Sequence, residues 1–308
     1  MATTKEQWHA ARNPPADPCK DPTVSFKDKT ILVTGAFGAN SLGHHAAIKY
    51  AALGANPLIL AVRTQQKGEQ AKASIIRETN CSPDIFIIET VDLSNFASVV
   101  NFANRIIKRV PSLHVVQLAA GVATVSYAQS PEGYEMALQV DVLSTILLAL
   151  LLLPKLRETA AKSPSSTPHL SFLNSLATFM IADKDPMLPP QGGQTLIQHL
   201  NDEKAFNAQH QYFLIKLATW YAIQGIVETV DRENIKTPNS QVVINATCPG
   251  LCKTDMVRDI PFVFKIMMNI KWHFLGRTAE NGARTLVSAT ALGSESHGRL
   301  WTNDRYLR

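Results

Sequence analysis

Tyr212 and Lys216 are the residues of this chain whose types and spacing best fit a chemical role. Of the six tyrosines, only Tyr212 is followed by a lysine four residues later. Residues at positions i and i+4 of a helix share a face, so a phenol and an ammonium group would be neighbours. A free tyrosine has a pKa of about 10, and a nearby positive charge lowers it. The pair could therefore donate a proton to a carbonyl oxygen or accept one from an alcohol.

A glycine-punctuated segment, ILVTGAFGANSLG over residues 31–43, provides a second candidate site. Gly35, Gly38 and Gly43 lie between an apolar strand pattern and a helix pattern that begins near Leu42. Glycine lets the backbone approach a phosphate closely, and the N-terminus of a helix attracts anions. Because the segment directly follows the first strand pattern, it predicts a nucleotide site.

The end of the second apolar strand indicates which dinucleotide would bind. NAD sites usually place a carboxylate there to hold the ribose 2′-hydroxyl. This strand instead ends in AVRT, and the next acidic residue is Glu69. Arg63 stands at the expected position, and a guanidinium group suits the 2′-phosphate of NADP(H). The sequence therefore favours NADP(H), with a solvent-facing charge at the end of the strand as the alternative for Arg63.

The order of apolar and amphipathic segments predicts a doubly wound α/β fold. Continuous apolar runs that alternate with segments of helical length are typical of a parallel sheet covered on both faces. Right-handed crossovers would make this a single Rossmann sheet of about seven strands. The expected strands are 30–34, 57–62, 85–91, 113–118, 169–174, 241–247 and a short one near 299–301, and the expected helices are 42–53, 65–79, 95–109, 135–159, 209–230 and 278–291.

One domain over residues 26–308 is expected after an irregular, proline-containing arm over residues 1–25. Two segments interrupt the alternation, near 183–210 and near 255–276, and each follows the expected carboxyl end of a strand. Ligands of open parallel sheets bind at that edge, so both segments are candidate walls of a substrate pocket. The apolar second segment suits an apolar substrate. Each segment could instead be a surface helix on the core or an oligomer contact.

The composition argues against several classes of function. A net charge of +5 without a basic run disfavours a nucleic-acid partner, and no strongly apolar run approaches the roughly 18 residues of a membrane helix. The first residues lack the apolar stretch of a secretory signal. Cys248 and Cys252, without a second ligand pair, predict ordinary buried thiols rather than a metal site. The expectation is a soluble cytoplasmic protein without a metal.

Taken in order, the motifs resemble those of the short-chain dehydrogenase/reductase family over nearly all of residues 26–303. The C-terminal segment GRTAENGARTLVSATALGSESHGRLW further resembles fungal members that are similar to retinol dehydrogenases. The similar segments are the cofactor loop TGAFGANSLG, the adenine-contacting pair Asp92–Leu93, the strand-end motif Ala119–Gly121, the carbonyl-polarising Ser175, the YxxxK pair Tyr212 and Lys216, and the nicotinamide segment Pro249–Gly250 with Thr254.

The resemblance implies reduction of a carbonyl by hydride transfer from NADPH. Ser175 would hydrogen-bond the carbonyl oxygen, Tyr212 would protonate the developing alkoxide, and Lys216 would hold the nicotinamide ribose and lower the pKa of Tyr212. The expected catalytic residues are Ser175, Tyr212, Lys216 and Asp141. The expected cofactor-binding residues are Gly35, Gly38, Asn40, Ser41, Leu42, Gly43, Arg63, Asp92, Leu93, Ala120, Gly121, Tyr212, Lys216, Pro249, Gly250 and Thr254.

The chain departs from the family pattern at several positions. The glycine loop is longer, with Ser41 where a glycine is expected, and Ala119 replaces the asparagine of the strand-end motif. Ser175 and Tyr212 are 37 positions apart, so the segment between them must loop away. The family's helix asparagine aligns with Asp141, whose charge would oppose ionisation of Tyr212. Asp141 could simply replace the asparagine, could shift the pH profile, or could serve a non-redox reaction.

The leading hypothesis is an NADPH-dependent ketoreductase of a bulky, mostly apolar metabolite in a fungal natural-product pathway. The alternative keeps the fold and NADP(H) but catalyses dehydration, isomerisation or cyclisation. A nucleotide-binding scaffold without catalysis is the third hypothesis, against which the intact set of Ser175, Tyr212 and Lys216 argues. The expected partner is a small carbonyl or alcohol compound. Family members often dimerise through two long helices, here 135–159 and 209–230, so a homodimer is a further expectation.

Overall fold

A computed structural model describes residues 19–163, 166–182, 185–189, 192–234, 241–257 and 276–307. The expected N-terminal arm is therefore described only from residue 19 onward. Most of the second interrupting segment, 258–275, lies outside the described residues, so its expected role as a pocket wall has no structural description.

An eight-stranded sheet forms the centre of the molecule, in the order β3-β2-β1-β4-β5-β6-β7-β8. Neighbouring strands are parallel except β7 and β8. The expected doubly wound α/β fold is confirmed. The strands are β1 (Ile31–Thr34), β2 (Leu58–Val62), β3 (Phe86–Thr90), β4 (Val115–Leu118), β5 (His169–Leu173), β6 (Val243–Thr247), β7 (Leu300–Thr302) and β8 (Arg305–Leu307).

The eighth strand is the difference from the expected number. Asn303 and Asp304 have φ angles of 50° and 55°, and they connect β7 to β8. A two-residue hairpin turn of type I′ needs positive φ at both positions, which Asn and Asp tolerate better than most residues. The chain therefore folds back on itself after β7, where the sequence pattern was too short to indicate a further strand.

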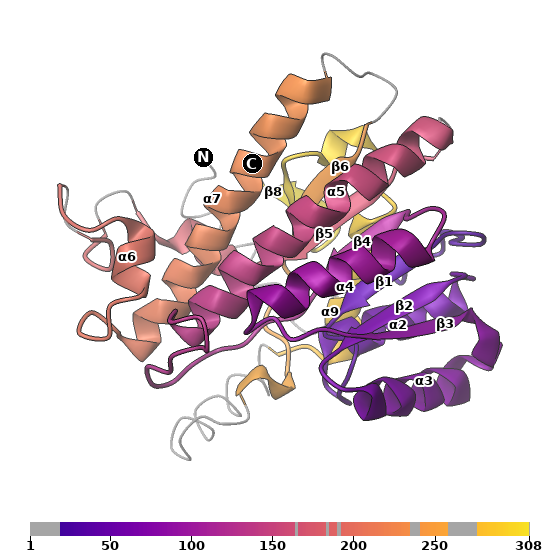
Figure 1. The fold of residues 1–308 in the computed structure, drawn as a ribbon, viewed down its shortest axis with the longest axis horizontal. Helices are drawn as coiled ribbons and strands as arrows, with labels where there is room; N and C mark the ends of the chain where they lie inside the picture. The colour runs from indigo at the N-terminus through magenta and orange to yellow at the C-terminus, as the bar shows by residue number, and fades with distance from the viewer. Residues whose placement is uncertain are drawn as a thin grey trace.

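Helices cover both faces of the sheet (Figure 1). Leu32 and Ile59 belong to the core cluster with residues of α4, α5 and α7, whereas Ile31 and Leu58 belong to the cluster with residues of α2, α3 and α9. Alternate side chains of one strand thus pack on opposite layers, as in parallel sheets that are buried on both sides. The helices are α2 (Leu42–Ala52), α3 (Gln65–Thr79), α4 (Phe96–Arg109), α5 (Thr145–Lys162), α6 (Leu196–Leu200), α7 (Ala208–Asn234) and α9 (Ala279–Ala289).

One helical stretch in the described part of the chain, Leu138–Lys162, is long and apolar enough to cross a membrane by length and composition. Its most apolar window is 67% buried inside the protein. In Figure 1, α5, which forms most of this stretch, lies between α4 and α7 on the sheet. A core helix of this kind passes the same test, so the stretch is weak evidence for a membrane.

Candidate active site

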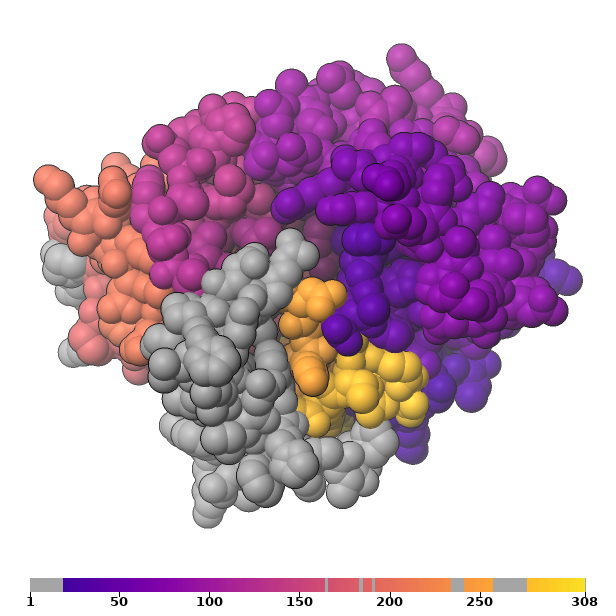
Figure 2. Space-filling view, turned by 90° about the horizontal axis from the view of Figure 1, so that it is seen from below, coloured from indigo at the N-terminus to yellow at the C-terminus, as the bar shows by residue number. Residues whose placement is uncertain are grey.

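A cavity of about 490 Å³ lies at the edge where the parallel strands end. Its walls come from the glycine-rich loop, the ends of β2 and β4, and the segment after β6. Figure 2 shows this last segment, in orange, beside the indigo N-terminal part of the chain. Asn40 Nδ2 donates a hydrogen bond to Asp255 Oδ1 over 3.1 Å, so the two sides of the cavity touch there.

Most of the expected cofactor-binding residues line this cavity. Six of them, Gly43, Asp92, Tyr212, Lys216, Pro249 and Gly250, are not part of its wall. Those in the wall are Gly35, Gly38, Asn40, Ser41, Leu42, Arg63, Leu93, Ala120, Gly121 and Thr254.

Ser41 and Gly35 show how the lengthened loop is shaped. The Ser41 hydroxyl donates to the Gly35 carbonyl over 2.7 Å and accepts from the His44 N–H over 3.3 Å. Ser41 is thus the N-cap of α2, a position that serine favours. Gly35 has a φ of +68°, and a Cβ there would lie 3.0 Å from Ala120 Cα. The serine therefore organises the loop, and Gly35 allows the close approach of the turn after β4.

Gly43 lies behind the cavity rather than in its wall. A Cβ at this position would lie 2.7 Å from the carbonyl oxygens of both Thr34 and Gly35. Gly43 therefore lets α2 pack directly against the end of β1. In this chain, the glycine of the cofactor-loop motif at position 43 therefore serves helix–strand packing.

Thr34 provides the connection that the missing asparagine of the strand-end motif would otherwise give. Its hydroxyl accepts hydrogen bonds from the N–H groups of Ala119 and Ala120, over 2.9 and 3.0 Å. These bonds tie the end of β4 to the end of β1. The replacement at Ala119 therefore leaves the turn held in place.

Two cations lie where the second strand ends. Arg63 and Lys67 both line the cavity, and Lys67 Nζ lies 5.4 Å from the centre of the Phe37 ring. Lys67 is in the first turn of α3, whose N-cap is Thr64. Sequence reasoning missed Lys67, although its place one turn after Arg63 was a usable signal. The only acidic residue among the described wall residues is Asp255.

Asp92 and Leu93, predicted to contact adenine, face different environments. Asp92 is exposed, and its Oδ1 accepts hydrogen bonds from the N–H and the hydroxyl of Ser94, over 2.9 and 2.7 Å. This carboxylate shapes the turn that leads into α4. Leu93 is buried and lines the cavity.

Ser175, Tyr212 and Lys216 come together beside the ends of β4 and β5. The Ser175 side chain lies close enough to Tyr212 to oppose the rise in the pKa of its phenol. Lys216 Nζ lies 5.8 Å from the centre of the Tyr212 ring. Ser175 also accepts from the Ala177 N–H over 3.2 Å, which caps the short helix after β5. The chain between Ser175 and Tyr212 loops away as expected, and its described part includes α6.

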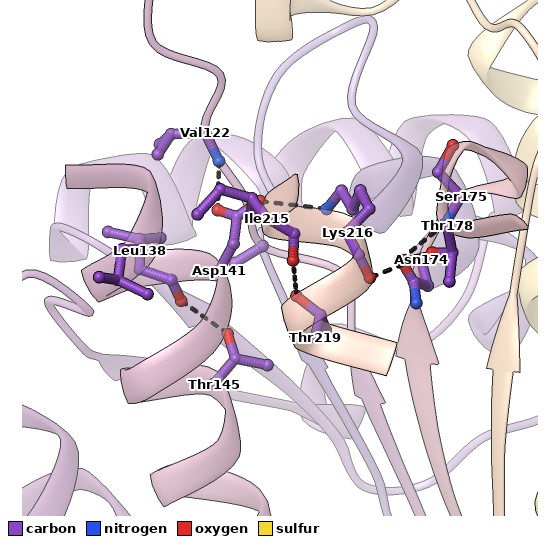
Figure 3. A network of polar contacts seen from close by, with 12 residues as sticks. Val122, Leu138, Asp141, Thr145, Asn174, Ser175, Thr178, Ile215, Lys216 and Thr219 are labelled. Atoms are coloured by element: carbon purple, nitrogen blue, oxygen red, sulfur yellow. Dashed lines mark hydrogen bonds and ion pairs between the residues drawn. The ribbon is translucent and has the colours of Figure 1, made fainter. Parts of the chain in front are cut away.

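Asp141 lies on a turn of π-helix, Leu138–Ser144, that runs directly into α5. Its Oδ2 lies 3.1 Å from Lys216 Nζ, and its Oδ1 accepts from the Val122 N–H over 2.8 Å (Figure 3). A Cβ at Gly121 would lie 3.1 Å from Oδ2. The carboxylate therefore fills the space beneath Gly121 and reaches the lysine directly. Single turns of π-helix are frequent at functional sites, and the sequence pattern gave no sign of this one.

Burial and the charges of Lys216 and Asp141 set the pKa shifts of the groups in this site. Burial raises the pKa of Tyr212, the Lys216 charge and the nearby Ser175 hydroxyl oppose this rise, and the Asp141 charge adds to it. The net direction is upward, opposite to the lowering expected from Lys216 alone, because desolvation of a phenolate outweighs the ammonium. Burial alone would lower the pKa of Lys216, but Asp141 holds that pKa above its usual value. Burial likewise raises the pKa of Asp141, against the opposing charge of Lys216.

Backbone contacts hold the helix of Tyr212 and the strand end of Ser175 in place. The Thr178 hydroxyl donates to the Lys216 carbonyl over 3.0 Å, and Asn174 Oδ1 accepts from the Ser175 N–H over 2.9 Å. Figure 3 shows these residues on the side of Lys216 away from Asp141. Sequence reasoning missed Asn174 and Thr178, which are polar residues beside the expected serine.

Cys248 and Cys252 are free thiols. The Leu176 N–H donates to Cys248 Sγ over 3.3 Å, and burial raises the pKa of both thiols. Over the part of the chain that the structure describes, no group of three His, Cys, Asp or Glu side chains is placed to hold a metal ion.

Comparisons with known proteins identify the family of the chain. The family model for short chain dehydrogenases matches residues 29–163. Over 97% of its length the chain is 39% identical to the short-chain dehydrogenase/reductase ffsI of Aspergillus flavipes, of which it covers 82%. It is 38% identical over 94% of its length to the short-chain dehydrogenase/reductase phmF of Phaeosphaeria nodorum, covering 81%.

A solved structure of a short chain dehydrogenase from Shigella flexneri, complexed with NADP, has a TM-score of 0.53 and 26% identity. The similarity covers 79% of this chain and 85% of that one. Fold and site together define a Rossmann-type oxidoreductase that uses a nicotinamide cofactor. The chain belongs to the short-chain dehydrogenase/reductase family, and its curated relatives named above are fungal proteins.

Proposed function

We propose that the protein reduces a carbonyl group of a bulky, mostly apolar metabolite, with NADPH as the hydride source and Tyr212 as the proton donor. The observation that carries this proposal is the placement of the Ser175 hydroxyl and the Lys216 ammonium beside the Tyr212 phenol. A hydroxyl donor, a phenol and a cation are the groups that ketone reduction requires around the substrate oxygen.

The cavity suits a phosphorylated dinucleotide. Gly35 and Gly38 have φ angles of +68° and +112°, so neither position adds a side chain of its own to the loop, although Asp255 Oδ2 lies 3.1 Å from where a Cβ of Gly38 would be. Ser41 caps α2 by accepting from the His44 N–H, and the positive end of the helix dipole at the start of α2 favours an anion. Arg63 and Lys67 would hold the 2′-phosphate, which is why NADP(H) is proposed over NAD(H).

NADPH, when bound, supplies the hydride. The side chains of this chain orient the carbonyl oxygen of the substrate and donate a proton to it. Ser175 orients the carbonyl oxygen and stabilises its growing negative charge. Tyr212 donates its proton to that oxygen. Lys216 stabilises the phenolate that remains, and Asp141 keeps Lys216 protonated at 3.1 Å. Asp141 and Lys216 are buried and Ser175 and Tyr212 are half-buried, which limits the water that competes for these hydrogen bonds.

Three apolar wall residues support an apolar substrate. Val122, Met136 and Val140 line the cavity near the end of β4. The similarity to fungal short-chain dehydrogenases supports a role in a fungal natural-product pathway. We place this activity in the cytoplasm.

A second candidate is a non-redox reaction, such as dehydration, isomerisation or cyclisation, with NADP(H) bound. The ion pair of Asp141 with Lys216 favours it, because a carboxylate here could serve acid–base chemistry. Absorbance of NADPH at its near-ultraviolet band separates the two reactions. Loss of absorbance in step with product formation supports the reductase, and product without loss supports the alternative.

The first test is the Tyr212→Phe variant, assayed with a panel of aromatic and aliphatic ketones and NADPH. Loss of the proton donor should lower kcat by roughly 10²- to 10⁴-fold, the usual contribution of general acid catalysis. The NADPH dissociation constant, measured by cofactor fluorescence, should stay unchanged. Tyr221→Phe on the same helix, where Tyr221 is 60% exposed, is the matched control. A Tyr212→Phe enzyme with native turnover would remove the mechanism.

A further inference from the structure

A buried carboxylate close to the site has no part in the proposed reaction. Glu135 is 0% exposed. Its Oε1 accepts a hydrogen bond from the Thr124 hydroxyl over 2.8 Å. Its Oε2 accepts from the Leu138 N–H and from Gln211 Nε2, both over 2.9 Å. Within the described residues it makes no ion pair, so these hydrogen bonds must compensate for the loss of water.

The partners of Glu135 belong to the elements that build the site. Thr124 follows Gly121, Val122 and Ala123, which line the cavity. Leu138 is the first residue of the π-helix that carries Asp141. Gln211 directly precedes Tyr212 in the first turns of α7. One carboxylate therefore joins the cavity wall and the segments that carry Asp141 and Tyr212.

The same residue anchors the segment between Ser175 and Tyr212. Gln211 Nε2 also donates to the Leu200 carbonyl, over 3.2 Å, at the end of α6. The Glu135 N–H donates to Asn201 Oδ1 over 2.7 Å. The described part of this segment is thus fastened to the start of α7 through Glu135 and Gln211.

Helix capping alone does not account for this arrangement. A cap requires an acceptor for the Leu138 N–H, and a short exposed serine or aspartate would serve. Glu135 is instead fully buried, and Gln211, itself 4% exposed, turns its side chain inward to reach it. A buried polar network with every member paired specifies one arrangement of the elements that it connects.

We infer that Glu135 is a positioning residue for Tyr212. Its carboxylate acts through Gln211 and holds the first turns of α7 in register with the Asp141 segment, so that the Tyr212 phenol lies beside Ser175. The inference rests on the proposed role of Tyr212 as proton donor. It concerns the placement of that phenol, which can be measured without any substrate.

The test uses the full-length protein labelled with ¹³C at the tyrosine Cζ atoms, whose NMR signals report the surroundings of each phenol. The Tyr212 signal is identified by its absence from Tyr212→Phe. Glu135→Ala and Gln211→Leu should both shift this signal, and the double variant should shift it no further than the larger single change. Amide hydrogen exchange in the first turns of α7 should rise roughly tenfold or more, since a hydrogen bond to a charged group is lost.

Glu135→Gln and Thr124→Val are the matched controls. The amide of Glu135→Gln can keep its oxygen toward Leu138 and Gln211 while its NH₂ donates to the Thr124 hydroxyl, so the Tyr212 signal should return to its native position. Thr124→Val removes a bond from the same carboxylate without touching α7, and it should leave the signal in place.

A native Tyr212 signal in Gln211→Leu would overturn the inference, and this variant decides the question even where Glu135→Ala does not fold. A shift in Thr124→Val as large as that in Gln211→Leu would also overturn it, because any disturbance of Glu135 would then suffice. Neither outcome depends on whether NADPH is consumed. Failure of this inference can therefore be distinguished from failure of the proposed ketoreductase activity.

Discussion

At the scale of single residues, the contact between Asp141 and Lys216 distinguishes this site. The two side chains are 2% and 6% exposed, and their charged atoms are 3.1 Å apart. Breaking a buried ion pair by neutralising one partner leaves the other charge without compensation. Asp141 therefore keeps Lys216 charged but also opposes ionisation of Tyr212, whose pKa it helps to raise.

Asp141→Asn should separate these two effects. Asparagine places an NH₂ group where one carboxylate oxygen now accepts, so this group would face either the Val122 N–H or Lys216 Nζ. Because the buried Lys216 charge would also lose its partner, the free energy of unfolding should fall by about 3–5 kcal/mol. Loss of the negative charge should lower the pKa of Tyr212, because that charge adds to the rise. Alcohol oxidation, which needs the phenolate, should then begin at a lower pH. Carbonyl reduction, which needs the protonated phenol, falls as pH rises, and this fall should also begin at a lower pH. Thermal melts and pH–rate profiles with native protein as reference test this; superimposable profiles would mean that the charge is irrelevant.

At the scale of elements, the junction of β2 and α3 is the place where we propose that NADP(H) is selected over NAD(H). β2 ends at Val62, Arg63 follows, and Thr64 caps α3 with Lys67 in its first turn. The helix start, the guanidinium and the ammonium all favour an anion at this place. The strand alone would present one cation, and the helix adds the second.

Arg63→Ala should weaken NADPH binding by roughly ten- to a hundredfold, the loss expected for hydrogen bonds to a charged group. NADH binding should change much less, because NADH lacks the 2′-phosphate. Lys67→Ala should act in the same direction, whereas Lys72→Ala, on the same helix and outside the cavity wall, should change neither constant. Fluorescence titrations give these constants, and equal losses for both cofactors would contradict the assignment.

At the scale of the whole molecule, the sheet divides two hydrophobic layers and leaves the cavity at one edge. The layer beneath α4, α5 and α7 carries Asp141 and Lys216 on helices that face one another, so the site depends on how these helices pack. Among the described residues, three exposed apolar side chains lie on the helices of this layer: Val100 on α4 at 37%, Leu150 on α5 at 48% and Tyr221 on α7 at 60%. Exposed apolar side chains on long helices suit a contact between two copies of the chain.

We therefore expect a homodimer formed through α5 and α7. Light scattering coupled to size-exclusion chromatography should give twice the mass of 33.8 kDa for the native chain. Leu150→Lys combined with Tyr221→Glu should shift the protein to the mass of one chain, because charges would be buried in the contact. Val24→Lys, a change at a 39% exposed residue outside both helices, should leave the dimer intact. A native protein with the mass of one chain would contradict the expectation.

By itself the sequence determined the α/β fold, the family, the glycine-rich turn, and the pairing of Tyr212 with Lys216. These features depend on local periodicity, since residues four apart on a helix are neighbours wherever the helix lies. Only the tertiary structure decided the π-helical turn that brings Asp141 to Lys216, and the burial that raises the pKa of Tyr212. The link from Glu135 to Gln211 joins residues 76 positions apart. Desolvation and long-range contacts arise from packing, and no spacing along the chain encodes them.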